Sequence, residues 1–479
     1  MRYHWVITAS AAALLAGCNV QTASGDSNTV SAAEAQNARW SDTTRDQLRT
    51  AIDGRAAHGL DGKDFAVSGD GDQAMTEAAL AYAGALAQGA TDPTKLYDVY
   101  TLKRPEVDLK AGLQQALAKN DVGGWLNSLA PQDDHYKRLS QAYVALRKEM
   151  AQGKAQTQPV VPEQGEAIKP NSTDPRMPQI ARQLVVLDYL DPKAAAGDRY
   201  TPQMAGAVKK MQADYGMEAD GVIGAEALAI LNQSDDVRAR AIAVNMERLR
   251  WLDRNPSPTR IDVNIAAARL NYFRDGKLAN SRRVVVGEPD HETPQLGSPM
   301  FRLVANPTWT VPRSIQENEI AGKGAGYLKA NNMEWKDGWI VQQPGPKNSL
   351  GLVKFDMQNE HAIYLHDTPA KALFGMTQRA RSHGCVRVED ALGFAQMLAE
   401  QEGVIDEWNK ARATGEQTFV KLPREIPVRL LYQTVLFDDS GAPIVRNDPY
   451  GWNDRVSEAL GFKGPASMRV KTGAADVGP

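Results

Sequence analysis

Cysteine is almost absent from this chain of 479 residues, which contains only Cys18 and Cys385. Two cysteines cannot build a disulfide framework, and no Cys-x-x-Cys pair indicates a zinc or redox site. Once Cys18 is removed or modified with the N-terminal segment, Cys385 is the only free thiol and cannot be lost to an intramolecular disulfide. A lone thiol that stays reduced is typical of a reactive residue, and a buried structural cysteine is the alternative.

Long apolar runs and an excess of one charge are missing as well. No run reaches the roughly 18 to 20 residues that a membrane-spanning helix needs. The formal net charge is −3, from 55 basic and 58 acidic residues, so the basic surface of a nucleic-acid-binding protein is not expected. The length and a hydrophobic content of 42% suit a globular protein of two to four domains.

The first eighteen residues read as an export signal. Arg2 precedes the short apolar stretch 6–16, and Leu-Ala-Gly-Cys closes the segment at Cys18. This ending resembles a bacterial lipobox, which implies a lipoprotein signal peptide over 1–18 and lipidation of Cys18. An ordinary cleaved signal is the alternative. Asn19 after the cysteine resembles the sorting signal of outer-membrane lipoproteins, so we expect a periplasmic protein whose lipid anchor is its only membrane contact.

Composition divides the region that follows. Residues 19–39 are small and polar and predict a flexible tether. Apolar residues recur at helical spacing through 40–150, for example Leu139 and Tyr143, so this range is predicted to be a helical scaffold domain. Residues 151–175 contain several prolines and glycines and are predicted to form a linker.

Residues 176–235 have the pattern of a compact helical unit. Thr201 followed by Pro202 predicts a helix start, with Thr201 as the N-cap. Asp220-Gly221 begins a tight turn before the last helix, and turn geometry alone accounts for these two residue types. The segment resembles the three-helix peptidoglycan-binding domain, which implies a cell-wall target.

Residues 260–437 alternate in a strand-like way and predict a mainly β domain. Asp275-Gly276 between two alternating runs predicts a hairpin, and residues 389–401 predict a helix. An insertion at about 313–350 begins with a capping box at Ser314 and is either a glycine-hinged lid or an ordinary surface excursion. With a C-terminal extension over 438–479, the predicted fold class is α+β multidomain.

The candidate chemistry lies in Ser-His-Gly-Cys-Val-Arg, residues 382–387. A thiolate at Cys385 can attack a carbonyl carbon, with a histidine as base and backbone amides around the oxyanion. A strand over 362–366 would place Tyr364 and His366 on one face, so His366 is preferred as base over the adjacent His383. His383 is either a donor to substrate or a packing residue.

Three further residues of this segment have open or supporting roles. Gly384 allows a close backbone approach, and the Cys385 amide is the natural oxyanion donor. Arg387 either binds a substrate carboxylate or ties the loop to an acidic neighbour.

A histidine followed by Ser-His-Gly-Cys, an apolar residue and Arg resembles the signature of the YkuD-type L,D-transpeptidases of bacterial cell walls. The flanking sequences around Trp309 and Tyr364 support the resemblance, which with the upstream domains points to the large Gram-negative members. It implies that Cys385 is the nucleophile and His366 the general base, oriented by a backbone carbonyl, that of Asp367. Support around the oxyanion or the base is assigned to Gly384, His383 and Asp367. The substrate-binding candidates are Tyr364, Ser382, Arg387 and Trp309.

The same resemblance implies the substrates. A tetrapeptide stem would donate its acyl group to Cys385 with release of D-alanine, and an amine of a second stem would form a 3→3 cross-link. Lipoprotein attachment, hydrolysis as an L,D-carboxypeptidase and D-amino acid exchange pass through the same thioester and remain open. No cofactor or metal is required, and acylation of the thiol would make the protein a carbapenem target.

Other classes fit the motif less well. A sortase has a different sequence before its cysteine, and papain-like peptidases place the cysteine before the histidine. A zinc site from His366, His383 and Cys385 has poor tetrahedral spacing. A peptidoglycan-binding lipoprotein without activity is the non-enzyme alternative, and the intact His366 and Cys385 argue against it.

Overall fold

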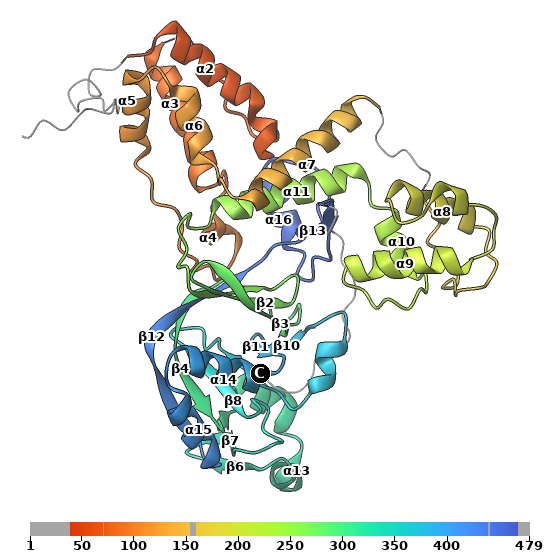
Figure 1. The fold of residues 1–479 in the computed structure, drawn as a ribbon, viewed down its shortest axis with the longest axis vertical. Coiled ribbons are helices and arrows are strands. Elements are labelled where there is room, and N and C mark those ends of the chain that lie inside the picture. The colour runs from red at the N-terminus through yellow and green to blue at the C-terminus, as the bar shows by residue number, and fades with distance from the viewer. Residues whose placement is uncertain (1–38, 70, 154–159, 439–440, 468–479) are drawn as a thin grey trace, which may run out of the picture.

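The computed structural model describes residues 39–69, 71–153, 160–438 and 441–467. Helices dominate the N-terminal half and strands the region below it in Figure 1, so the α+β multidomain prediction is confirmed. The predicted export signal, Cys18 and nearly all of the tether lie outside the described residues. Among the helices that the structure describes, none is both long and apolar enough to cross a membrane.

The N-terminal region is helical, as its apolar spacing predicts. Leu48 on one helix and Leu139 and Tyr143 on another are fully buried, because each stripe faces the shared interior. Ser41 caps the first helix by accepting the Thr44 amide. The elements are α2 (Asp42–Asp53), η1 (Gly54–His58), α3 (Asp72–Gln88), α4 (Pro93–Leu96), α5 (Leu109–Ala118), α6 (Val122–Leu129) and α7 (Asp134–Ala151).

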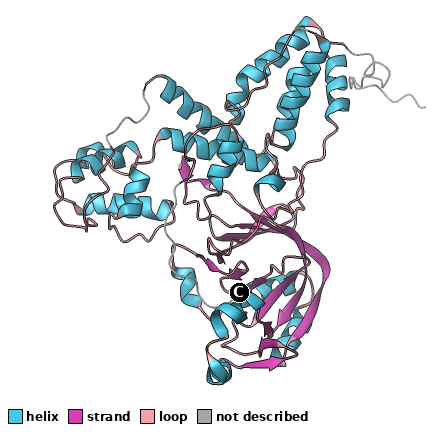
Figure 2. Cartoon of the chain, turned by 180° about the vertical axis from the view of Figure 1, so that it is seen from behind, coloured by secondary structure: helices cyan, strands magenta, loops and turns pink. Residues whose placement is uncertain are grey.

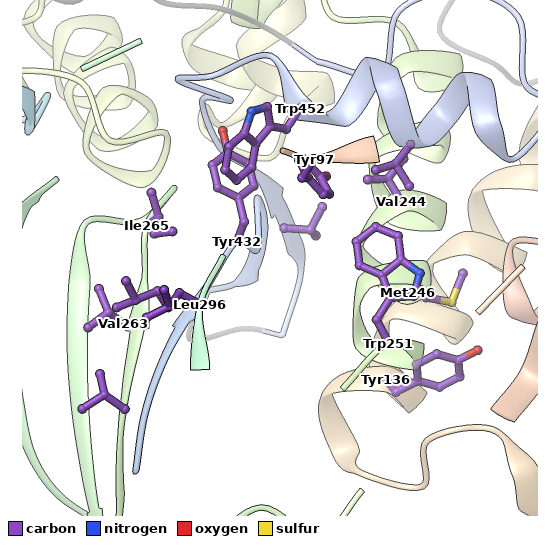
Figure 3. Close-up of a cluster of buried hydrophobic side chains, with 14 of the residues drawn as sticks. Tyr97, Tyr136, Val244, Met246, Trp251, Val263, Ile265, Leu296, Tyr432 and Trp452 are labelled. Atoms are coloured by element: carbon purple, nitrogen blue, oxygen red, sulfur yellow. The ribbon is translucent and has the colours of Figure 1, made fainter. Parts of the chain in front are cut away.

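A long helix, α11 (Asp235–Arg250), links this region to the rest of the chain. It packs against α7 and against the C-terminal helix α16 (Trp452–Ala459), as Figure 1 shows. One continuous core includes Tyr136 of the helical region, Trp251 after α11 and Val263 of the β-rich region (Figure 3). The range called a C-terminal extension therefore contributes to the main core, through α16 and through β14 (Pro443–Val445), which pairs with β13 (Val435–Phe437).

The three-helix unit stands to one side and has its own core (Figure 1). Thr201 accepts the Met204 amide at 3.3 Å and so caps the second helix as predicted. Val161 and Ile168, from the range expected to be linker, are buried in this core, because Ile168 pairs with Ile223. The helices are α8 (Met177–Val186), η2 (Pro192–Ala194), α9 (Pro202–Asp214) and α10 (Ala225–Leu231).

The predicted turn of this unit is built by side chains of the unit itself. Asp220 accepts the Val222 amide at 2.8 Å and the Gln212 side chain at 2.9 Å. Gly221 has a φ of +80°, where other residues are strained, and donates its amide to Gln212. Both residues therefore serve the turn.

The β-rich region is a nine-stranded sheet in the order β10-β3-β11-β9-β8-β4-β12-β1-β2, which an additional β2–β3 pairing closes on itself. The predicted hairpin is present, with Asp275 and Gly276 both at positive φ. Its strands are β1 (Arg260–Asn264), β2 (Arg269–Arg274), β3 (Lys277–Gly287), β4 (Gly297–Ala305), β8 (Val353–Met357), β9 (Leu365–His366), β10 (Ala380–Ser382), β11 (Val386–Val388) and β12 (Thr418–Leu431).

Helices cover part of this sheet, as Figure 2 shows in cyan against magenta. The helix predicted from residue 389 starts two residues later, because Asp390 at φ 44° is its N-cap and accepts the Gly393 amide. The helices are η4 (Lys371–Gly375), α14 (Ala391–Gln401) and α15 (Ile405–Ala413).

The insertion is a folded subdomain of the β-rich region with a small core of its own, which includes Trp309, Val311 and Ile340. The predicted capping box is wrong, because the helix already starts at Arg313 after Pro312 and Ser314 lies inside it. The elements are β5 (Trp309–Thr310), α12 (Arg313–Ile315), η3 (Gln316–Ile320), α13 (Gly324–Ala330), β6 (Met333–Lys336) and β7 (Trp339–Gln342). Their strands form a three-stranded sheet in the order β5-β7-β6.

Candidate active site

Two neighbouring parallel strands bring the candidate nucleophile and base together. Val386 of β11 pairs with Leu365 of β9, and the Val386 amide donates to the Tyr364 carbonyl at 3.1 Å. Cys385 stands directly before β11, and His366 ends β9. Although the two residues are nineteen positions apart in the sequence, this register therefore places them at neighbouring positions in the sheet.

The strand predicted over 362–366 is shorter than expected. Only Leu365–His366 form β9, since Ala362 adopts a φ of +55°, which interrupts an extended strand. Tyr364 and His366 still lie side by side, with ring centroids 5.6 Å apart. His361 is exposed, in agreement with a structural or solvated role.

Cys385 is a buried thiol. Its residue is 7% exposed, and Sγ lies 3.6 Å from the Ala362 carbonyl. Burial raises the pKa of Cys385, while hydrogen bonds from Tyr364 and the charges of Lys354 and Arg387 oppose the rise. The thiol is therefore protonated at neutral pH in the resting site, and attack on a carbonyl carbon requires a base.

His366 is held in one tautomer. Its ring is fully buried, and Nδ1 contacts the Asp367 carbonyl. A carbonyl only accepts, so Nδ1 carries the proton and Nε2 is the basic nitrogen. Asp367 is itself fixed, because its amide donates to the Val353 carbonyl at 2.9 Å and its carboxylate accepts the Leu352 amide and pairs with Lys371.

Tyr364 joins the thiol to the insertion. Its hydroxyl is hydrogen-bonded with Cys385, and burial raises the pKa of Tyr364 well above its usual range. Its side chain also packs against the core of the insertion. Trp309 is only 1% exposed and belongs to the core of the insertion, so it supports Tyr364 and does not offer a surface to substrate. Lys354, which no sequence motif indicated, lies 4.2 Å from the Tyr364 ring.

The loop before the cysteine is held by hydroxyl groups. Ser382 is fully buried, donates to the Cys385 carbonyl at 2.6 Å and accepts the Gly384 amide at 3.2 Å. Both partners belong to the loop, so the hydroxyl of Ser382 holds the loop together, and contact of Ser382 with substrate stays a prediction. Thr293 donates to the Gly384 carbonyl at 2.7 Å, a contact across 91 positions that sequence spacing does not reveal. Gly384 has a φ of +110°, which explains why glycine stands there.

Arg387 and His383 of the motif have different surroundings. Arg387 is 1% exposed and pairs along the strand with His366, so its charge lies near the thiol and not at the surface. His383 Nε2 lies 2.8 Å from a carboxylate oxygen of Glu319, which belongs to the insertion. Glu319 was not singled out from the sequence. Its contact places the insertion against the catalytic loop, as a lid would lie.

Three family models match separate parts of the chain. Residues 258–411 match the "L,D-transpeptidase catalytic domain", residues 32–143 a "Scaffold domain" and residues 173–231 a "Putative peptidoglycan binding domain". The first match contains the Cys385 and His366 site, and the other two coincide with the helical region and the three-helix unit.

Among curated proteins, a "Putative L,D-transpeptidase" of Haemophilus influenzae is 32% identical over 246 residues, 46% of this chain and 49% of that protein. The chain thus spans about half the length of this relative. L,D-transpeptidase structures from Stackebrandtia nassauensis (15% identity, TM-score 0.24, 57% of this chain and 96% of that one) and Xylanimonas cellulosilytica (16%, 0.21, 56% and 99%) are also similar. Since these TM-scores are low, the assignment rests on the family models and the curated relative.

Proposed function

Since the chain carries a YkuD-type L,D-transpeptidase catalytic domain and a peptidoglycan-binding domain, we propose that it forms 3→3 cross-links in peptidoglycan through a thioester on Cys385. The observation that carries the proposal is that two neighbouring parallel strands present a buried, protonated thiol and a histidine whose Nδ1 is held by the Asp367 carbonyl. This is the arrangement that general-base-assisted nucleophilic attack requires.

In the first half-reaction, Cys385 Sγ attacks the carbonyl carbon before the terminal D-alanine of a donor stem. His366 Nε2 accepts the thiol proton during the attack and returns it to the amine of D-alanine as the C–N bond breaks. The Cys385 amide is the proposed oxyanion donor, because the Gly384 amide is already bound to Ser382. The products are a thioester on Cys385 and free D-alanine.

In the second half-reaction, the side-chain amine of a diaminopimelate in another stem attacks the thioester. His366 Nε2 takes a proton from this amine, and the departing sulfur receives it. Tyr364 and Arg387 remain the candidate groups for substrate near the thiol, since the Tyr364 hydroxyl reaches Cys385 and the Arg387 charge acts on it. A lysine of a lipoprotein, water or a free D-amino acid as acceptor would give attachment, hydrolysis or exchange.

The location of the protein follows from the same proposal. Residues 1–18 would direct export, lipidation of Cys18 would anchor the chain to the outer membrane, and the peptidoglycan-binding domain would hold it at the cell wall in the periplasm. The thioester chemistry also makes Cys385 a target for carbapenems.

Intact-protein mass spectrometry tests the chemistry. A carbapenem should add once to the full chain and to Cys18→Ser, but not to Cys385→Ala. Muropeptide analysis of cells with and without Cys385→Ala then tests the acceptor. If no adduct forms on Cys385, the protein is a non-enzymatic wall-binding lipoprotein; if an adduct forms but 3→3 dimers do not depend on Cys385, another acceptor is used.

A further inference from the structure

Beside the catalytic loop, four side chains with metal-binding chemistry converge from three segments of the chain. Glu288 and His291 follow the end of β3, His383 belongs to the catalytic loop, and Glu319 comes from the insertion. The ligand atoms of Glu288, His291 and His383 all lie within 4.8 Å of one another. None of these residues is the nucleophile or the base.

The contacts inside this cluster are pairs of an imidazole and a carboxylate. His291 Nδ1 lies 2.8 Å from Glu288 Oε1, and His383 Nε2 lies 2.8 Å from Glu319 Oε1. The two histidine rings stand 4.6 Å apart between centroids, which connects the pairs. Exposed carboxylates alone often gather without a metal, but two imidazoles with carboxylates form the donor set that Zn²⁺ prefers.

A bound ion requires the ligand atoms to draw closer together. With Zn–N and Zn–O bonds of about 2.0 to 2.2 Å, tetrahedral ligand atoms lie roughly 3.3 to 3.6 Å apart. The ligand atoms of Glu288, His291 and His383 must therefore draw together by up to about 1.2 to 1.5 Å. The His291 side chain can make this movement because it is 46% exposed. Its backbone stays fixed, since its amide donates to the Glu288 carbonyl at 2.9 Å. Glu319 contacts His383 but lies outside this group of three, so its side chain must move further to reach the same ion.

We propose that Glu288, His291 and His383 bind a Zn²⁺ ion, with Glu319 as the fourth ligand. Because His383 stands two residues before Cys385 and Glu319 belongs to the insertion, the bound ion ties the insertion to the catalytic loop. It acts as a clamp that slows access of the donor to the thiol, and no step of the reaction passes through it.

Binding is tested with Zn²⁺ alone on the full chain carrying Cys18→Ser and Cys385→Ala, which removes both thiols as ligands. Calorimetric titration should give one saturable equivalent per chain. His291→Ala should weaken binding by about tenfold or more, because one of three or four ligands is lost. His361→Ala is the matched control, an exposed histidine outside the cluster that should leave binding unchanged. Co²⁺ should show the d–d absorption of a tetrahedral site.

Two results would overturn the proposal. The first is that the thiol-free chain shows no saturable binding of Zn²⁺. The second is that it binds Zn²⁺ equally well with and without His291→Ala. The protein that retains Cys385 supplies the second measurement. Zn²⁺ should slow carbapenem acylation and a chelator should restore it, whereas His291→Ala should be insensitive. If His291→Ala is slowed equally, the clamp is refuted. The binding measurement uses a chain that cannot acylate, so it succeeds or fails independently of the transpeptidase assignment.

Discussion

The two helical regions of this protein relate to the catalytic domain in opposite ways. The peptidoglycan-binding domain has a separate core, and the residue from elsewhere that joins this core is Ile444. The scaffold region shares one core with α11, the sheet and α16. A unit with its own core can in principle fold alone, whereas a shared core makes its parts unfold together. The first region is therefore a separable module and the second is part of the catalytic body.

A buried ion pair stands at the junction of scaffold and catalytic body. Glu247 and Arg250 of α11 have fully buried side chains. Glu247 accepts the Thr91 amide at 2.7 Å, and Arg250 donates to the His58 carbonyl at 2.7 Å and the Tyr136 hydroxyl at 2.8 Å. Because the bonds to Thr91, His58 and Tyr136 cross from α11 to the scaffold, this pair is a sharp place to test whether the two are one unit.

The largest expected effect is that of Glu247→Ala. It leaves Arg250 charged and buried without its carboxylate, which should cost about 3 to 5 kcal/mol of the free energy of unfolding. Chemical denaturation followed by fluorescence and by acylation should show both signals lost in one transition. The control is Asp46→Ala, which breaks an exposed pair with Arg49 at the same spacing and should change stability by less than about 1 kcal/mol. Separate transitions for Glu247→Ala would contradict a shared core.

The next effect in size is that of acid, which should lower the stability of the two regions by different amounts. Burial, followed by the charge of Arg250, lowers the pKa of His58 to about 4. Between pH about 6.5 and 4 the unfolded chain binds the proton that the folded chain excludes, so stability falls as the pH falls through this window. The loss should reach up to about 3 kcal/mol for the body that contains the scaffold.

The peptidoglycan-binding domain supplies the internal comparison for this pH effect, since residues 160–234 contain no histidine. Lowering the pH from 7 to 4.5 should therefore reduce the free energy of unfolding of the catalytic body more than that of this domain. Chemical denaturation at the two pH values measures both. In His58→Gln the difference between the two pH values should shrink. An unchanged difference in that variant would assign the effect to other groups.

Gln212→Leu tests whether the peptidoglycan-binding domain can be destabilised without any effect on the catalytic body. Gln212 is 1% exposed, and its side-chain oxygen accepts the Gly221 amide at 2.8 Å. Leucine leaves this buried amide unsatisfied, which should cost about 1 to 3 kcal/mol within the domain alone. Hydrogen exchange should show faster opening of residues 160–234, with unchanged acylation of Cys385. Slower acylation would show that the two cores are coupled.

Replacement of residues 160–234 by a flexible linker should have the smallest effect on the catalytic body. The expected result is an unchanged rate of acylation by a soluble carbapenem, since no residue of the Cys385 site comes from this domain. Sedimentation with isolated peptidoglycan should be weakened. If the catalytic body no longer folds after the replacement, the peptidoglycan-binding domain is not a separable module.

Local sequence was sufficient for much of the fold. The Asp275-Gly276 turn, the Thr201 cap and the apolar stripes of the scaffold were predicted because short-range geometry decides them. The capping box at Ser314 and the strand over 362–366 failed because a preceding Pro312 and a left-handed Ala362 changed the local path of the chain. Residues 161 and 168 were expected in a linker because nothing near them in sequence reveals their distant core partners.

What the sequence alone determined is the pair of Cys385 and His366 with its motif, because the residue types needed for thiol chemistry are few and stand in one short pattern. The tertiary structure decided the rest. It buried the thiol and raised its pKa, placed Ser382 inside the loop, brought Glu319 to His383, and merged the scaffold with the catalytic body. These outcomes depend on contacts between residues far apart in the chain, and the packing of the whole fold determines which of those contacts form.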